Sequence, residues 1–173
     1  EIVILFRFGY PIWTARVTDV PSTYESVHLR VVAQQFPWNF HYPGPDGKLG
    51  KTRADLVDEQ ENPVGLDRSS DNASDDFYTV NQLHVPVNKK IRIDLTSLDV
   101  IHSFWVPKLA GKVDMVPSEG NSMWFQANEP GEYFGQCAEY CGTSHANMRF
   151  KVIAVPEHEY VAWLQSVSDT HRT

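Results

Sequence analysis

Cys137-Ala-Glu-Tyr-Cys141-Gly-Thr-Ser-His145-Ala-Asn-Met148 places two thiols, an imidazole and a thioether within one short stretch of the chain. Both cysteines of the protein and one of its three methionines lie here. Thiolate and imidazole ligands with a weak thioether are typical of copper sites that transfer electrons. Structural zinc sites more often use a closed set of cysteine and histidine, without methionine. The stretch therefore predicts a copper site in a protein that moves electrons.

A disulfide is the structural alternative for the two cysteines, because a pair of cysteines in a secreted chain usually forms one. Only three residues separate Cys137 from Cys141, so the bridge would close a very small ring. Such a ring removes little entropy from the unfolded chain. A disulfide would also leave His145 and Met148 unexplained, and the copper interpretation is therefore preferred.

A copper site of this kind needs a second imidazole, and His102 in Asp99-Val-Ile-His-Ser-Phe-Trp-Val-Pro107 is the candidate. It follows residues 90–96, in which apolar and polar side chains alternate as in a half-buried strand. The aromatic and proline residues after it are suited to keeping water away from a metal. The remaining histidines lack this context and are interpreted as ordinary core or surface residues: His28, His41, His84, His158 and His171.

Two kinds of copper site fit these residues. The ligand set of a mononuclear blue-copper site is complete in His102, Cys141, His145 and Met148. Cys137 would be surplus to that site. If both thiolates bridged two copper ions, each ion would hold one imidazole, and Met148 and the main-chain carbonyl of Glu139 would be weak ligands. A bridged pair spreads one electron over two metals, and the extra cysteine favours this binuclear site.

Three stretches closely resemble subunit II of the haem-copper cytochrome c oxidases, which carries the binuclear CuA centre: His102–Pro107, Lys112–Pro117 and Gly135–Met148. The resemblance extends over most of the chain, from Val31 to Leu164. It implies the electron-accepting subunit of a terminal oxidase, which takes single electrons from cytochrome c. It further implies that the electrons pass to haem in subunit I, where oxygen is reduced to water.

The resemblance also implies a role for each candidate ligand. His102 and His145 would each bind one copper. Cys137 and Cys141 would bridge both ions through their thiolates. The Met148 thioether and the main-chain carbonyl of Glu139 would be weak ligands. In the family the side chain at the position of Glu139 also reaches a magnesium or manganese ion at the boundary with subunit I. Quinol-oxidising relatives lack the copper ligands, so their presence here implies a cytochrome donor.

The aromatic segment that accepts electrons in the family usually reads Gln-Trp-aromatic-Trp, whereas this chain has Gln35-Phe-Pro-Trp38. Phe36 and Trp38 are therefore the candidate electron-accepting residues. The structural alternative is one buried face of an alternating strand through Phe36, Trp38, Phe40 and Tyr42. A second departure follows Pro117, where the family often has Gly-Arg and this chain has Ser118-Glu119.

Two other copper proteins remain as alternatives. The first is a freestanding mononuclear blue-copper carrier. The second is the copper domain of a nitrous oxide or nitric oxide reductase. Nitrous oxide reductases tend to have tryptophan where Glu139 stands, and they add a histidine-rich propeller that this sequence lacks.

Composition indicates one folded domain, because the 173 residues are 42% hydrophobic and include five tryptophans. The formal charge of -7 argues against nucleic acid as a partner and favours a basic electron donor. No Gly-rich phosphate loop or nucleophilic serine motif is present. The chain alone is therefore expected to transfer electrons, and the chemistry on oxygen is expected in its partner.

Short strands separated by turns predict an all-β Greek-key sandwich or barrel, which the resemblance narrows to a cupredoxin-like fold over residues 18–173. The expected strands after a β-rich segment at 27–42 are Phe77–Val85, Lys90–Leu95, Met123–Ala127, Gly131–Phe134 and Phe150–Val155. A C-terminal helix is expected from Glu157 to about Val167. The polar, acidic residues 48–76 are interpreted as a long insertion between strands, and donor docking is one hypothesis for it.

No segment reaches the roughly 18 consecutive apolar residues of a membrane-spanning helix. Family members carry an N-terminal transmembrane hairpin, so residues 1–17 are expected to be the remnant of its second helix. A short buried strand or helix is the alternative. The resemblance implies a membrane-anchored protein whose copper domain lies on the periplasmic face.

Overall fold

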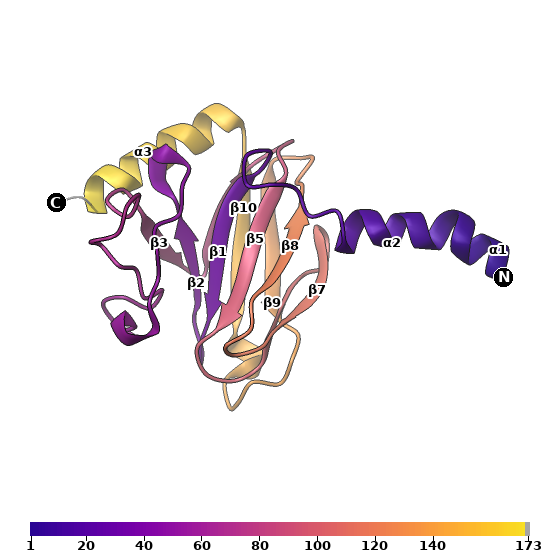
Figure 1. Cartoon of the computed structure of the whole chain (residues 1–173), viewed down its shortest axis with the longest axis horizontal. Helices are drawn as coiled ribbons and strands as arrows, with labels where there is room; N and C mark the ends of the chain where they lie inside the picture. The colour runs from indigo at the N-terminus through magenta and orange to yellow at the C-terminus, as the bar shows by residue number, and fades with distance from the viewer. Residues whose placement is uncertain (172–173) are drawn as a thin grey trace.

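Ten strands form two stacked five-stranded sheets within residues 1–171, the part of the chain that this computed structural model describes (Figure 1). The last two residues of the predicted domain, 172 and 173, lie outside the described residues. Side chains alternate between buried and accessible in β5 and β10, and every second residue of β5 from Ile91 to Ser97 is buried. This period of two directs one face of each sheet into a shared core.

The first sheet has the strand order β3-β2-β1-β5-β8, and β1 pairs with β5 in parallel. Its strands are β1 Val27–Ala33, β2 Trp38–Tyr42, β3 Phe77–Val80, β5 Ile91–Ser97 and β8 Asn121–Phe125. The second sheet has the order β4-β10-β9-β6-β7, and β4 pairs with β10 in parallel. Its strands are β4 Gln82–Pro86, β6 His102–Val106, β7 Ala110–Met115, β9 Gly131–Cys137 and β10 Arg149–Val155. The predicted cupredoxin-like sandwich is confirmed.

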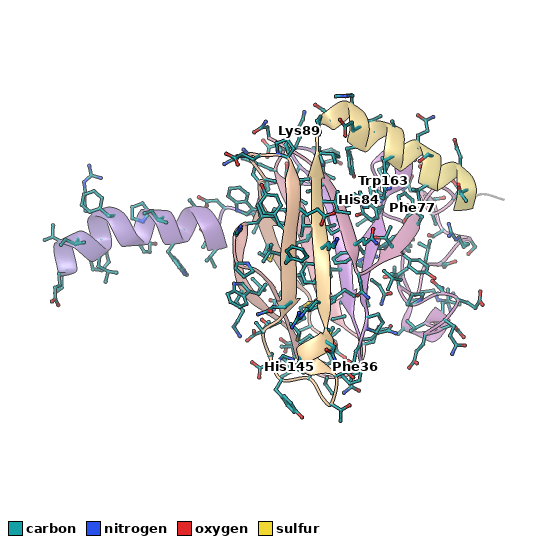
Figure 2. The ribbon with its side chains drawn as sticks, turned by 180° about the vertical axis from the view of Figure 1, so that it is seen from behind. Phe36, Phe77, His84, Lys89, His145 and Trp163 are labelled. Carbon is teal, nitrogen blue, oxygen red and sulfur yellow. The ribbon has the colours of Figure 1, made fainter. Side chains whose placement is uncertain are left out.

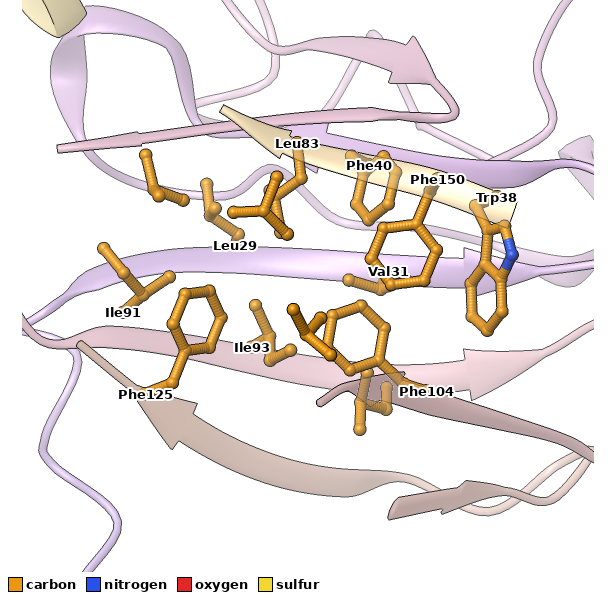
Figure 3. Packing of buried hydrophobic residues seen from close by; sticks show 14 of the residues in the cluster. Leu29, Val31, Trp38, Phe40, Leu83, Ile91, Ile93, Phe104, Phe125 and Phe150 are labelled. Carbon is orange, nitrogen blue, oxygen red and sulfur yellow. The ribbon is translucent and has the colours of Figure 1, made fainter. Parts of the chain in front are cut away.

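Aromatic and β-branched side chains from both sheets fill the space between them (Figure 3). The indole of Trp38 packs against the rings of Phe150 and Phe104, with centroids 5.0 and 5.9 Å apart. All three side chains are almost completely buried. This aromatic cluster joins β2 to β6 and β10, which are the strands that lead into the predicted copper site.

The C-terminal helix is confirmed as α3, Glu157–His171, and it extends past the predicted end at Val167. Its Trp163 stacks on the imidazole of His84 in β4, with the ring centroids 4.1 Å apart and the planes inclined by 16° (Figure 2). Trp163 also meets Tyr42 and Phe77 edge-on. Helix α3 thus covers the end of the sandwich opposite the cysteine loop.

Two strand predictions were wrong. The segment Phe77–Val85 is not one strand, because Asn81 adopts a positive φ of 57° and separates β3 from β4. These two strands then join different sheets. The antiparallel pair of β6 and β7 was missed, because its residues lack the regular alternation that marks the other strands.

The predicted insertion lies between β2 and β3 as expected. It contains one short 3-10 helix, η3 Ala54–Leu56, and another, η2 Gly44–Asp46, lies just before it. A third, η4 His145–Asn147, lies in the cysteine loop. The apolar residues of the insertion form a small second core with β1, consisting of Val32, Val64, Leu66 and Ala73.

The first residues of the chain are helical and project from the sandwich (Figure 1). They form α1 Ile2–Ile4, a π-helical segment η1 Leu5–Gly9 and α2 Tyr10–Val17. Most of their large apolar side chains are exposed, Ile2 by 73% and Trp13 by 52%. None of the helices within residues 1–171 has the length and apolar character needed to cross a membrane. The assignment of residues 1–17 to a membrane helix stays a prediction.

We predict that Gly135→Ala destabilises the sandwich. A Cβ atom at Gly135 in β9 would lie 2.1 Å from Cζ of Phe150 in β10, so the buried phenyl ring would have to move. Overpacking of this kind costs about 1–3 kcal/mol. Urea unfolding measures the difference. Gly120→Ala is the matched control, because a Cβ there meets no atom within 4 Å. Equal unfolding midpoints for the two variants would contradict the predicted clash.

Candidate metal centre

The cysteine loop connects β9 to β10 at one end of the sandwich. Figure 2 shows His145 of this loop at the same end as Phe36, and Lys89 at the opposite end. The Cys137 N–H donates to the Met148 carbonyl over 3.0 Å, which closes the base of the loop. Within it, η4 turns the chain so that the side chain of His145 points back toward the cysteines.

The side chains of the loop converge on Cys141. Its Sγ lies 3.7 Å from Sγ of Cys137, 3.5 Å from Nδ1 of His145 and 3.6 Å from Sδ of Met148. A disulfide would require a sulfur–sulfur distance of about 2.05 Å. Both cysteines are therefore free thiols, and the structure contains no disulfide between them.

His102, the first residue of β6, completes the cluster from another part of the chain. Its Nδ1 lies 3.9 Å from Sγ of Cys137, and the main-chain oxygen of Glu139 lies 3.1 Å from the same sulfur. The ligand atoms of His102, Cys137 and Cys141 all lie within 4.8 Å of one another, which is close enough to share a metal ion. The structure thus brings all six predicted ligands together.

Burial gives these groups an unusual electrostatic environment. His102 and Met148 are at most 1% exposed, and Cys137 and Cys141 are 5% and 3% exposed. Burial raises the pKa of the Cys137 thiol, but hydrogen bonds with His102 and with the backbone bring that pKa below its usual range. Burial and the neighbouring Cys137 both raise the pKa of Cys141. Ionisation of one thiol therefore opposes ionisation of the other, and a nearby cation would reduce this repulsion.

This donor set fits copper. A bound cation would offset the repulsion between two thiolates and would replace their protons. Thiolate, imidazole and thioether donors are the set that soft copper ions prefer. The residues present therefore fit a copper centre, with one imidazole next to each of the two sulfurs.

The two candidate electron-accepting residues occupy different environments. Phe36 precedes β2, is partly buried and lies against Gly142, where an added Cβ would come within 3.1 Å of its ring. Trp38 is completely buried beneath the site, and its indole N–H donates to the Met148 carbonyl over 3.4 Å. Trp38, Phe40 and Tyr42 are buried as the strand interpretation predicts, but the alternation is wrong, because Asn39 and His41 between them are buried too. An electron-accepting role for Phe36 or Trp38 stays a prediction.

The Glu139 carboxylate lies at the surface. It is 46% exposed, and its Oε2 lies 3.8 Å from Nζ of Lys112 in β7. The magnesium or manganese interaction of this side chain stays a prediction.

Four of the remaining histidines have partners elsewhere, as expected of ordinary residues. His28 pairs with Asp94, His41 pairs with Asp76, and His84 stacks on Trp163. The fourth is His158, whose Nε2 lies 3.9 Å from Oε1 of Glu159. The side chain of His171 lies outside the described part of the structure.

Two residues at the site were missed by the sequence analysis. Asp99 Oδ1 lies 2.8 Å from Nε2 of His102, and Gln35 Nε2 donates to the Cys141 carbonyl over 2.6 Å. Asp99 could have been found from the sequence, because it is an acidic residue only three positions before the candidate ligand His102. No local pattern indicates Gln35, because Cys141 is 106 residues further along the chain.

Comparisons with known proteins agree with this site. The family model of the periplasmic domain of cytochrome c oxidase subunit II matches residues 27–155. The alternative cytochrome c oxidase subunit 2 of Bradyrhizobium diazoefficiens is 38% identical over 158 residues, which are 91% of this chain and 56% of that protein. The chain spans about half the length of several such curated relatives.

Two solved structures are similar as well. The periplasmic domain of subunit II of cytochrome oxidase from Bradyrhizobium japonicum is 30% identical, with a TM-score of 0.64 over 89% of this chain and 99% of that one. A mixed-disulfide intermediate between a thioredoxin-like protein and subunit II of cytochrome c oxidase is 26% identical, with a TM-score of 0.63 over 90% of this chain and 99% of that one. On the family match over residues 27–155, the chain belongs to the cytochrome c oxidase subunit II family and contains the periplasmic domain of that subunit.

Proposed function

We propose that this chain is the electron-accepting part of a cytochrome c oxidase, in which a binuclear CuA centre receives single electrons from cytochrome c. The observation that carries the proposal is the convergence of two thiols, two imidazoles, a thioether and a carbonyl in one buried cluster. When bound, a copper pair supplies a one-electron redox centre. The electron would then pass to haem in subunit I, where oxygen would be reduced.

The chain's own residues prepare this centre in three ways. His102 lies beside Cys137 and His145 lies beside Cys141, so each imidazole would hold one copper, and both thiolates would be shared between the two ions. Met148 and the Glu139 carbonyl would be weak ligands. Burial of the cluster limits access of water, which would influence the reduction potential of a bound copper pair.

The mononuclear blue-copper alternative is less well supported. In that site Cys137 would be incidental, yet its sulfur lies close to His102, to the Glu139 carbonyl and to Cys141. These contacts place Cys137 among the other candidate ligands, which favours a role for its thiolate in metal binding.

The partners are part of the same proposal. The exposed apolar side chains of residues 1–17 support a membrane anchor at this end of the chain. The partly exposed Glu139 carboxylate supports a contact, through magnesium or manganese, with subunit I. The negative charge of the chain supports a basic cytochrome as the donor.

We predict that the copper-loaded protein holds two copper ions per chain. Its EPR spectrum should show one unpaired electron shared by two copper nuclei. Cys137→Ser removes one bridging thiolate and should reduce the content to at most one copper ion with a single-nucleus hyperfine pattern. Ser144→Ala, in the same loop, is the control and should keep both ions. Full copper content in Cys137→Ser would support the mononuclear carrier instead.

We predict that the apo-protein forms a disulfide between Cys137 and Cys141 in air, because the two sulfur atoms are only 3.7 Å apart. The mixed disulfide in a related structure supports such thiol chemistry in this family. Thiol titration before and after air exposure measures the loss of both thiols. Copper uptake should stop at the same time and return after reduction. Two thiols that stay free in air would contradict the prediction.

We predict that Phe36→Leu slows electron uptake without changing copper content. The Phe36 ring lies on the backbone of Gly142, between the loop that carries the ligands and the surface. Stopped-flow mixing with reduced cytochrome c measures the rate. Phe134→Leu, which changes an exposed ring on β9, is the control and should leave the rate unchanged. Equal rates of electron uptake in the wild type, Phe36→Leu and Phe134→Leu would contradict a role for Phe36 in electron transfer.

A further inference from the structure

Gln35 connects the two parts of the chain that carry the metal ligands. Its backbone N–H donates to Asp99 Oδ2 over 2.6 Å, in the turn that leads to His102. Its side-chain Nε2 donates to the carbonyl of Cys141 over 2.6 Å. One residue therefore holds both the histidine of β6 and the cysteine loop, and the next residue in the chain is Phe36.

Asp99 is the other half of this connection. Its Oδ1 lies 2.8 Å from Nε2 of His102 and also accepts the backbone N–H of Val100 over 2.7 Å. The His102 side chain is completely buried, while that of Asp99 is 30% exposed. The carboxylate thus reaches from the surface to the inner edge of the imidazole.

The Asp99 contact fixes which nitrogen of His102 can bind a metal. An ionised carboxylate only accepts hydrogen bonds, so Nε2 must carry the ring proton. The lone pair is then on Nδ1, which is the nitrogen that faces Cys137 Sγ. A carboxylate behind a metal-binding imidazole orients the ring and raises its basicity.

The packing around Gly142 shows how closely the Gln35–Phe36 segment follows the cysteine loop. An added Cβ at Gly142 would lie 2.7 Å from Nε2 of Gln35 and 3.1 Å from Cζ of Phe36. Gly142 also has a φ of +133°, which side chains rarely adopt. The glycine lets the segment lie directly on the backbone next to Cys141.

We propose that Asp99 and Gln35 form a clasp that positions His102 for copper through Nδ1 and holds Phe36 against the cysteine loop. Both are positioning residues that act through a ligand or through the backbone. This inference rests on the proposed copper function for its effect on the metal. The orientation of His102 by Asp99, however, is a property of the protein without metal.

The first arm of the test uses the apo-protein. In the wild type, the Nε2–H proton of His102 should be visible by NMR as a slowly exchanging resonance, because it is buried and bonded to Asp99. In the wild type, one carboxylate oxygen faces His102 and the other accepts the Gln35 N–H. The amide of Asp99→Asn has only one acceptor oxygen, so one of these two hydrogen bonds is lost. Exchange of this proton should then be faster. Asp114→Asn is the matched control, because its carboxylate bonds to Ser103 and Lys112 instead.

The second arm uses the copper-loaded protein. Loss of a carboxylate behind a metal-binding histidine typically weakens metal binding about 10- to 100-fold. Asp99→Asn should show such a loss of copper affinity and a higher reduction potential, because the imidazole becomes a weaker donor to the oxidised metal. Asp114→Asn should show neither change. Gln35→Ala should keep both copper ions and slow electron uptake from reduced cytochrome c, with Gln126→Ala as its control.

The outcomes separate the clasp from the proposed function. A wild type that binds no copper would sink the copper function, while the NMR arm would still decide whether Asp99 fixes the His102 proton. Copper binding in the wild type with identical affinity, potential and proton exchange in Asp99→Asn and Asp114→Asn would overturn the clasp. If Asp99→Asn does not fold, Asp99→Ser retains an acceptor for the Val100 N–H and replaces it in both arms.

Discussion

The site depends on the backbone closure at the base of the cysteine loop. The Cys137 N–H bonds to the Met148 carbonyl, and the Ala138 N–H bonds to the Ser103 carbonyl, each over 3.0 Å. The first bond brings the two ends of the loop together, and the second joins the loop to the residue after His102. Each ordered backbone residue costs about 1–2 kcal/mol in entropy, so an irregular loop needs fixed ends. The pairing of β9 with β10 fixes the two ends of the loop, and this in turn limits the positions of the ligands within it.

The core beneath this closure keeps the ligands in place. Trp38, Phe104 and Phe150 pack directly under the loop, and Trp38 also contacts the ring of His102 with centroids 6.3 Å apart. A close-packed interior resists changes of even one methylene group. The buried pair of thiols is therefore held in one arrangement by the side chains around it. The same packing that stabilises the sandwich therefore limits movement of the side chains in the cluster.

The sequence allowed the cysteine loop to be identified because its ligands are local, with spacings of four, four and three residues. His102 could be found because it follows a regular strand. The division of Phe77–Val85 between two sheets could not be predicted, since it follows from the backbone of Asn81 and from partners far along the chain. The role of Gln35 was hidden for the same reason, because hydrogen bonds to residues 64 and 106 positions away leave no local pattern.

The acidic insertion is held to the sandwich, which changes how its charge can act. Asp76 is fully buried, and its Oδ2 lies 2.6 Å from Nε2 of His41 in β2 and accepts the Gly50 N–H over 2.8 Å. Arg68 donates to the carbonyls of Ala73 and Asp76. These bonds fix the ends of the loop while other carboxylates stay at the surface. Charges fixed in position create a field of constant direction, whereas charges on a mobile loop average out. A basic donor approaching the insertion would therefore meet an oriented field, and its association rate should depend on salt.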